Sequence, residues 1–199
     1  MSTSTTATMT PEQRVTKVFE LLKTGSKMQH IEGKMTQLGH SLLVAHMARN
    51  DGTDDETVLA ALMIDIGHLI IPSINLANSA YFINYTITDS AGNISTVDHR
   101  RFGANCLRQL GFSKKMCDLI ESNGLAKRYL SINSLDYSPS ASSTSKESLR
   151  LQEDPLFEHK VQLAIWGYAC EDMLVVPPVL DCYRGIAIKN LLMSTKTLY

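Results

Sequence analysis

The stretch LAALMIDIGHLI, residues Leu59–Ile70, decides the fold. It is apolar nearly all round, which predicts a buried central helix, from about residue 55 to residue 68, in an all-α protein. Asp65 and His68 interrupt it three positions apart, so both project toward neighbouring parts of one helix face. Burying such groups is costly unless they are paired or ligated. The pair therefore indicates either a functional site or a structural carboxylate that caps a helix or bonds a core histidine.

The composition is that of an ordinary globular protein. Of the 199 residues, 44% are hydrophobic and 20% are charged. The formal net charge of −1 gives no electrostatic reason to expect nucleic acid or an anionic membrane as a partner. The sequence has no apolar run of membrane-spanning length and no signal-peptide core. Its four cysteines lack C-x-x-C spacing and are expected to be buried or partly buried thiols. A cytoplasmic protein is therefore expected.

The pattern along the chain predicts a flexible N-terminus (1–10) followed by one helical domain over residues 11–199. Cap and breaker signals predict further helices over about 11–25, 35–49, 99–110, 113–123, 155–172 and 179–193. Two stretches, 72–97 and 138–148, are rich in Ser, Thr or Asn and predict long loops, the second flexible, that could cover a site.

Two further histidines flank the central stretch in the sequence. His40 lies on the predicted helix before it, and His99 begins the helix after it. This order resembles the HD superfamily, whose helical members hold a metal centre. Over residues 28–190 the chain most resembles the HD-domain mixed-valence diiron oxygenases that cleave phosphonates, relatives of myo-inositol oxygenase. The matching segments are QLGHSLLVAHMA, VLAALMIDIGH, DHRRFGANCLRQLGFSKK, AKRYL (126–130) and DPLFEHKVQLAIW (154–166). The resemblance implies a single HD-domain helical bundle.

The metal ligands of that family carry over only in part. Its leading histidine, bridging aspartate and later histidine match His40, Asp65 and His99. The other three ligand positions hold residues that coordinate iron weakly or not at all: Ile64, Asn123 and Gly167. The resemblance therefore implies that three of the six ligands are lost and that a diiron centre is not retained.

Only some of the residues that contact the phosphonate in the family are matched in this sequence. Its D-x-G-H histidine and the lysine of AKRYL match His68 and Lys127, whereas one arginine of the family is Ala164 here. A tyrosine that gates the iron in the family matches His30. The resemblance implies an anion-binding remnant in a larger, more apolar cavity. Its substrate-binding candidates are His30, Ile64, Asn123, Lys127, Ala164 and Gly167.

The remaining ionisable residues favour metal-free chemistry. Neutral imidazoles can act as general bases, and a lysine can stabilise a developing oxyanion. We therefore expect a repurposed HD-fold enzyme that needs no cofactor. It would catalyse a cyclisation, isomerisation, dehydration or lyase reaction on a small, fairly apolar oxygenated metabolite of specialised metabolism. The catalytic candidates are His40, Asp65, His68, His99 and Lys127.

Two alternatives stay open. His40, Asp65 and His99 have the composition of a mononuclear iron(II) facial triad, two histidines and a carboxylate. The first alternative is therefore an oxygenase or hydrolase that retains one iron or another divalent ion at these residues. The second is a non-catalytic protein whose pocket binds a small ligand. The expected partner is a small molecule, with no nucleic acid and no membrane, and a homodimer is left open.

Overall fold

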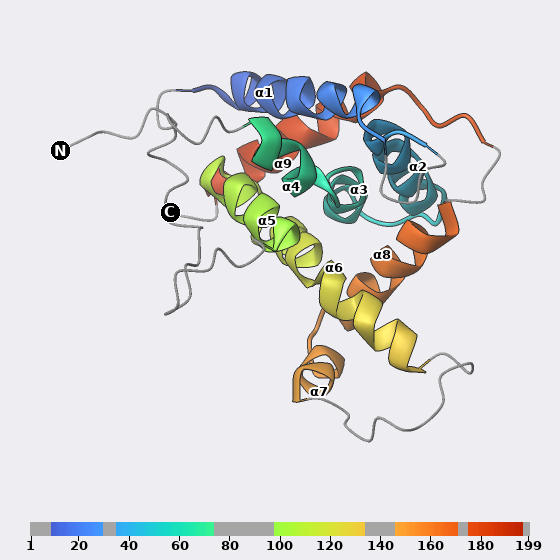
Figure 1. Cartoon of the computed structure of the whole chain (residues 1–199). Helices are drawn as coiled ribbons and strands as arrows, with labels where there is room; N and C mark the ends of the chain where they lie inside the picture. The colour runs from blue at the N-terminus through green and yellow to red at the C-terminus, as the bar shows by residue number, and fades with distance from the viewer. Residues whose placement is uncertain (1–8, 30–34, 74–97, 134–145, 171–174, 197–199) are drawn as a thin grey trace, which may run out of the picture.

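The computed structural model describes residues 9–29, 35–73, 98–133, 146–170 and 175–196 (Figure 1). Within these ranges the chain is helical, as predicted, apart from an isolated β-bridge between Gln29 and Thr36 and the connecting turns. The α-helices are α1 (Pro11–Thr24), α2 (Gln37–Asn50), α3 (Asp55–Leu62), α4 (Ile66–Ser73), α5 (His99–Gln109), α6 (Lys114–Asn133), α7 (Lys146–Gln152), α8 (Phe157–Ala169) and α9 (Arg184–Lys196). Two 3-10 turns join them, η2 (Gly25–Lys27) and η5 (Leu180–Tyr183).

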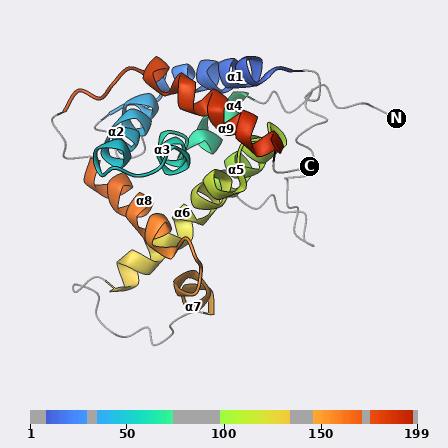
Figure 2. The same cartoon turned by 180° about the vertical axis from the view of Figure 1, so that it is seen from behind.

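α3 lies in the middle of the bundle in both views (Figures 1 and 2). The carboxylate of Asp54 caps it by accepting hydrogen bonds from the backbone N–H groups of Glu56 and Thr57 at 3.1 and 3.2 Å. All residues from Thr57 to Leu62 are buried, because α2, α6, α8 and α9 pack around the helix. The neighbouring helices thereby cover the apolar side chains of α3 on every side.

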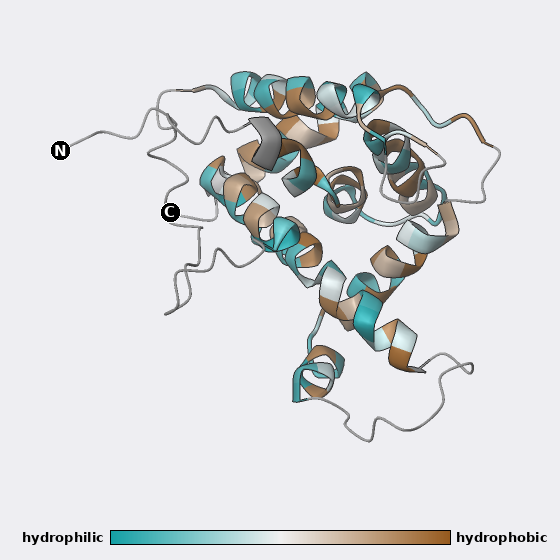
Figure 3. Ribbon diagram, viewed as in Figure 1, coloured by the Kyte–Doolittle hydropathy of each residue, from teal (hydrophilic) through white to brown (hydrophobic). Residues whose placement is uncertain are grey.

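α1 covers one side of the bundle with an amphipathic face. A reciprocal pair of hydrogen bonds between Thr10 and Gln13 starts the helix, with Pro11 as its first residue. Hydrophilic and apolar residues alternate along it in Figure 3. The apolar face packs on the core through Val15, Val18, Phe19 and Leu22.

The predicted helix 55–68 is wrong in one respect, because it is broken at residues 63–65. Met63 departs from helical geometry with φ −108° and ψ 16°. The backbone N–H of Ile66 then donates to the carbonyl of Met63 at 3.1 Å, and that of His68 donates to the carbonyl of Asp65 at 2.9 Å. Asp65 therefore lies in a turn between two helices. Neither glycine nor proline occupies the break, which we attribute to the packing of α4 on α5.

α4 and α5 meet backbone to backbone at two glycines. A Cβ added to Gly67 would lie 1.8 Å from the carbonyl oxygen of His99, far inside van der Waals contact. A Cβ on Gly103 would lie 2.9 Å from the backbone nitrogen of Gly67. Because neither residue has a side chain, the first turn of α5 can lie directly against α4.

Other boundaries differ from the sequence-based expectations. α6 continues ten residues beyond its predicted end at 123, so Asn123 and Lys127 share one helix. Residues 146–148 belong to α7 and not to a loop, whereas 74–97 and 138–145 lie outside the described residues. Cys106, Cys117 and Cys170 are buried, but Cys182 is exposed, contrary to expectation. The division into a flexible N-terminus and a single domain over 11–199 stays a prediction. Among the described helices, none is long and apolar enough to span a membrane.

Candidate metal centre

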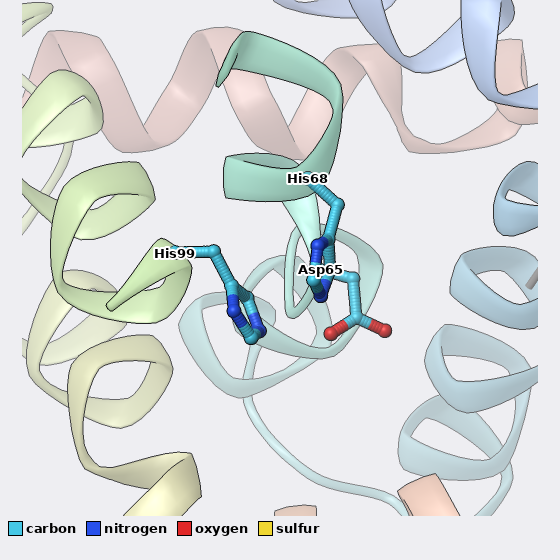
Figure 4. Close-up of side chains that lie close together, drawn as sticks. All are labelled: Asp65, His68 and His99. Atoms are coloured by element: carbon cyan, nitrogen blue, oxygen red, sulfur yellow. The ribbon is translucent and has the colours of Figure 1, made fainter. Parts of the chain in front are cut away.

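Asp65, His68 and His99 converge where the α3–α4 turn faces the start of α5 (Figure 4). One carboxylate oxygen and one ring nitrogen from each histidine all lie within 4.8 Å of one another. Two ligands about 2.1 Å from one ion are about 3 Å apart when adjacent and about 4.2 Å apart when opposite. The three donor atoms therefore lie close to the separations that a shared ion requires. Asp65 is 9% exposed, and the histidines are partly buried.

The two histidines of the cluster stack on each other. Their ring centroids are 3.5 Å apart and their planes are inclined by 28°. Burial, followed by the charges of His68 and Arg100, lowers the pKa of His99 to about 4. The imidazole is therefore neutral at physiological pH, the form that binds metals. Its buried Nε2 atom has no hydrogen-bond partner in the described part of the chain, so it is available to a ligand.

His40 approaches the same carboxylate from α2. Its Nδ1 lies 3.0 Å from Oδ2 of Asp65, and its Nε2 lies 3.3 Å from the carbonyl oxygen of Gly167. The side chain is 1% exposed and is thus fixed between two oxygen atoms. The metal set expected from the sequence was His40, Asp65 and His99. In the structure the third member of the cluster is His68, and His40 contacts Asp65 from outside the cluster.

Ile64, Lys127 and Gly167 adjoin one another beside this cluster. A Cβ on Gly167 would lie 3.8 Å from Cδ1 of Ile64 and 3.9 Å from Nζ of Lys127. The ammonium group of Lys127 also stands 4.7 Å from the ring centroid of Tyr168, a cation–π distance. Since the carbonyl of Gly167 contacts His40, these residues border the metal candidates on the α8 side.

The remaining sequence-predicted residues have different surroundings. Asn123 is 1% exposed, and neither atom of its amide has a hydrogen-bond partner among the described residues. Ala164 packs in a small apolar cluster with Ala126 and Leu151. His30 lies outside the described residues. The sequence analysis missed the close contact at Gly67, for which the glycine of the D-x-G-H segment was the available signal.

Named proteins from three organisms are similar to this chain. It is 32% identical over 143 residues to a hydroxymethylphosphonate dioxygenase of Gimesia maris, covering 72% of this chain and 64% of that protein. It is 27% identical over 133 residues to a glycine-betaine-forming 1-hydroxy-2-(trimethylamino)ethylphosphonate dioxygenase of Leisingera caerulea, covering 67% and 61%. An uncharacterised protein of Acanthamoeba polyphaga mimivirus is 28% identical over 196 residues, covering 92% and 84%.

The chain is distantly similar to these two dioxygenases, which supports an HD-domain relationship. It spans less than two thirds of the length of each of the two dioxygenases, at 64% and 61%. No family model matches the chain. The similarity agrees with the helical architecture and with the donor cluster at the start of α5.

The expectation of a metal-free isomerase, cyclase or lyase is wrong. Two findings contradict it: the relatives named as dioxygenases, and the cluster of Asp65, His68 and His99 that could hold an ion. The same findings contradict the expectation that no cofactor is needed. The physical reason is that the structure brings His68, a family substrate contact that was counted here as a catalytic candidate, close to Asp65 and His99, so that three donors lie together.

Proposed function

We propose that this protein is a metal-dependent oxygenase that acts on a small phosphonate through one ion held by Asp65, His68 and His99. The observation that carries the proposal is the convergence of one carboxylate and two imidazoles within 4.8 Å. This is the donor set of the facial triad that holds mononuclear iron(II) in oxygenases. The two relatives named as phosphonate dioxygenases supply the reaction and substrate class.

The surroundings of the cluster support one ion over two. The resemblance to diiron oxygenases aligns Ile64, Asn123 and Gly167 with ligand positions. Ile64 is 1% exposed and presents only carbon to the space beside Gly167, which has no side chain. Asparagine offers a neutral oxygen, a weaker iron ligand than imidazole or carboxylate. A second ion would therefore have too few donors.

The residues of the chain have separable roles in this proposal. A bound iron ion would supply the dioxygen activation that amino-acid side chains lack. Lys127 would bind the anionic phosphonate oxygens, since its ammonium lies within the same neighbourhood as Gly167 and Ile64. His40, between Asp65 and the carbonyl of Gly167, would hold the carboxylate of Asp65 in its orientation. Ile64 would exclude water from the reacting face.

Metal analysis tests the donor set directly. Protein purified anaerobically without chelators should contain about one iron per chain by mass spectrometry. Asp65→Ala and His99→Ala should lose it, whereas His159→Ala, a half-exposed histidine outside the cluster, should retain it. Two irons per chain, or full iron content in both site variants, would contradict a single ion at this cluster.

Dioxygen uptake tests the reaction. The iron-loaded protein should consume dioxygen and release phosphate when hydroxymethylphosphonate is added. His159→Ala should match the wild type, and His99→Ala should be inactive. Stoichiometric iron with no uptake on this substrate or on 1-hydroxy-2-(trimethylamino)ethylphosphonate would contradict the assigned activity and favour the non-catalytic alternative.

A further inference from the structure

Asn123 is the clearest buried polar group whose partner is missing from the described protein. It is 1% exposed, and both its Oδ1 and Nδ2 atoms lack a hydrogen bond there. Buried side-chain amides in folded proteins are nearly always hydrogen-bonded, because burying a donor and an acceptor without partners costs free energy of desolvation. An amide with both ends open indicates a partner outside the described residues.

Asn190 shows what a structural asparagine looks like in the same protein. It is 6% exposed, and its Oδ1 accepts from the backbone N–H of Ser113 at 3.0 Å. Its Nδ2 donates to the hydroxyl of Ser113 at 3.0 Å. This amide is satisfied at both ends by the residue before α6, whereas that of Asn123 is satisfied at neither.

The helix geometry places Asn123 on the face of α6 that also carries Lys127. Lys127 lies four residues further along α6, on the same face and one turn away. Its ammonium is beside Gly167, whose carbonyl contacts His40. The adjacent Gly124 packs on Arg100, the residue after His99. The side of α6 that carries Asn123 therefore lies between α8 and the start of α5.

We propose that Asn123 contacts the substrate of this oxygenase through a hydroxyl group that the phosphonate carries; the inference rests on the proposed function. The Nδ2 group can donate to any oxygen acceptor, but Oδ1 needs a donor. Ionised phosphonate oxygens only accept, and they suit Lys127. A hydroxyl group supplies the missing O–H donor for Asn123. The names of both dioxygenase relatives include such a hydroxylated phosphonate.

Ligand binding by the iron-loaded protein under argon tests this contact. Isothermal titration should show that the wild type binds hydroxymethylphosphonate at least about 10-fold more tightly than methylphosphonate, as expected for a buried polar group matched to a hydroxyl. Asn123→Leu should bind the two compounds equally and keep its iron. Persistence of the preference in Asn123→Leu, or absence of a preference in the wild type, would overturn the role of Asn123 while leaving the oxygenase proposal intact.

Thermal unfolding of the metal-free protein gives a second measurement. Asn123→Leu should melt no lower than the wild type, because no hydrogen bond to the described residues is lost. The matched variant Asn190→Leu should melt about 2–6 °C lower, because two hydrogen bonds are broken. An equal loss in Asn123→Leu would show that the amide is engaged within the protein and would overturn the proposal. If neither phosphonate binds to wild-type protein of full iron content, the hydroxyl contact and the substrate class both fail, but the metal site stands.

Discussion

The imidazole rings of His68 and His99 lie face to face, 3.5 Å apart, although they come from two different helices. His68 belongs to α4 and His99 is the first residue of α5. The contact depends on the approach of the two helix backbones at Gly67. It brings the second imidazole to the carboxylate of Asp65, and the first three predictions below follow from this geometry and its surroundings.

Gly67→Ala should disrupt the metal centre although it changes none of the three ligand residues. The new methyl group would meet the carbonyl oxygen of His99 at 1.8 Å, so α5 must move away. We expect a loss of about 2–4 kcal/mol in the free energy of unfolding and a lower iron content. Denaturant titration and metal analysis would measure these. Gly185→Ala is the control, because that Cβ would meet nothing within 4 Å and should stabilise α9 by about 0.5–1 kcal/mol. Equal iron content in Gly67→Ala and wild type would count against this role.

Metal removal should lower the melting temperature. An ion that binds only the folded chain, at a free concentration 100 times its dissociation constant, adds about 2.7 kcal/mol to the free energy of unfolding. For a protein of this size that raises the melting temperature by roughly 5–10 °C. Dialysis against a chelator should therefore lower the Tm of the wild type and of His159→Ala, and iron(II) should restore it. His99→Ala should show no such difference. A chelator effect of the same size in His99→Ala would refute the assignment.

Lys127→Met should weaken phosphonate binding and leave the metal in place. Losing a charged hydrogen bond to the anion costs about 1.5–3 kcal/mol, which predicts a KM about 10- to 100-fold higher. Steady-state dioxygen uptake would measure it. Arg128→Met is the matched control, because that side chain is 65% exposed and pairs with Glu147 outside the cluster. Similar KM values for the two variants would argue against Lys127 as the anion contact.

The cap of α3 should make stability depend on pH in the acid range. Burial raises the pKa of Asp54, but hydrogen bonds from Lys115 and Thr57 outweigh it and lower the pKa to about 2. Because the folded pKa is below the unfolded one, the stabilisation is complete above about pH 4 and is lost as the pH falls through 2. Asp54→Ala should cost about 1 kcal/mol at pH 7 and progressively less toward pH 2. Urea titrations of both proteins at several pH values would reveal a constant difference if this explanation is wrong.

The sequence predicted most of the helices because their signals are local. The caps at Thr10 and Asp54 and the apolar spacing of Val15 and Phe19 depend on residues a few positions apart. The break at residues 63–65 could not be predicted, because an apolar run without glycine or proline carries no signal for it. It arises from the packing of α4 on α5, a contact between segments distant in the sequence.

The centre was predicted only in part, for the same reason. Asp65 and His99 were named as metal candidates in the alternative interpretation, and the structure brings them close together. The addition of His68 depends on how far α5 lies from α4, which spacing along one helix does not give. The metal-free interpretation followed from counting the ligand positions that are lost. It did not consider that His68, which matches a substrate contact of the family, could supply a donor here.

Gly67 and Gly103 also bear on how this centre could be re-engineered. The separation of the donors is set by contact between two backbones, so it does not depend on the size of the neighbouring side chains. Ile64, which borders Gly167, could then be exchanged for a smaller residue while the separation of the two helices persists. The two glycines allow no such freedom, and any library built on this scaffold should leave them fixed.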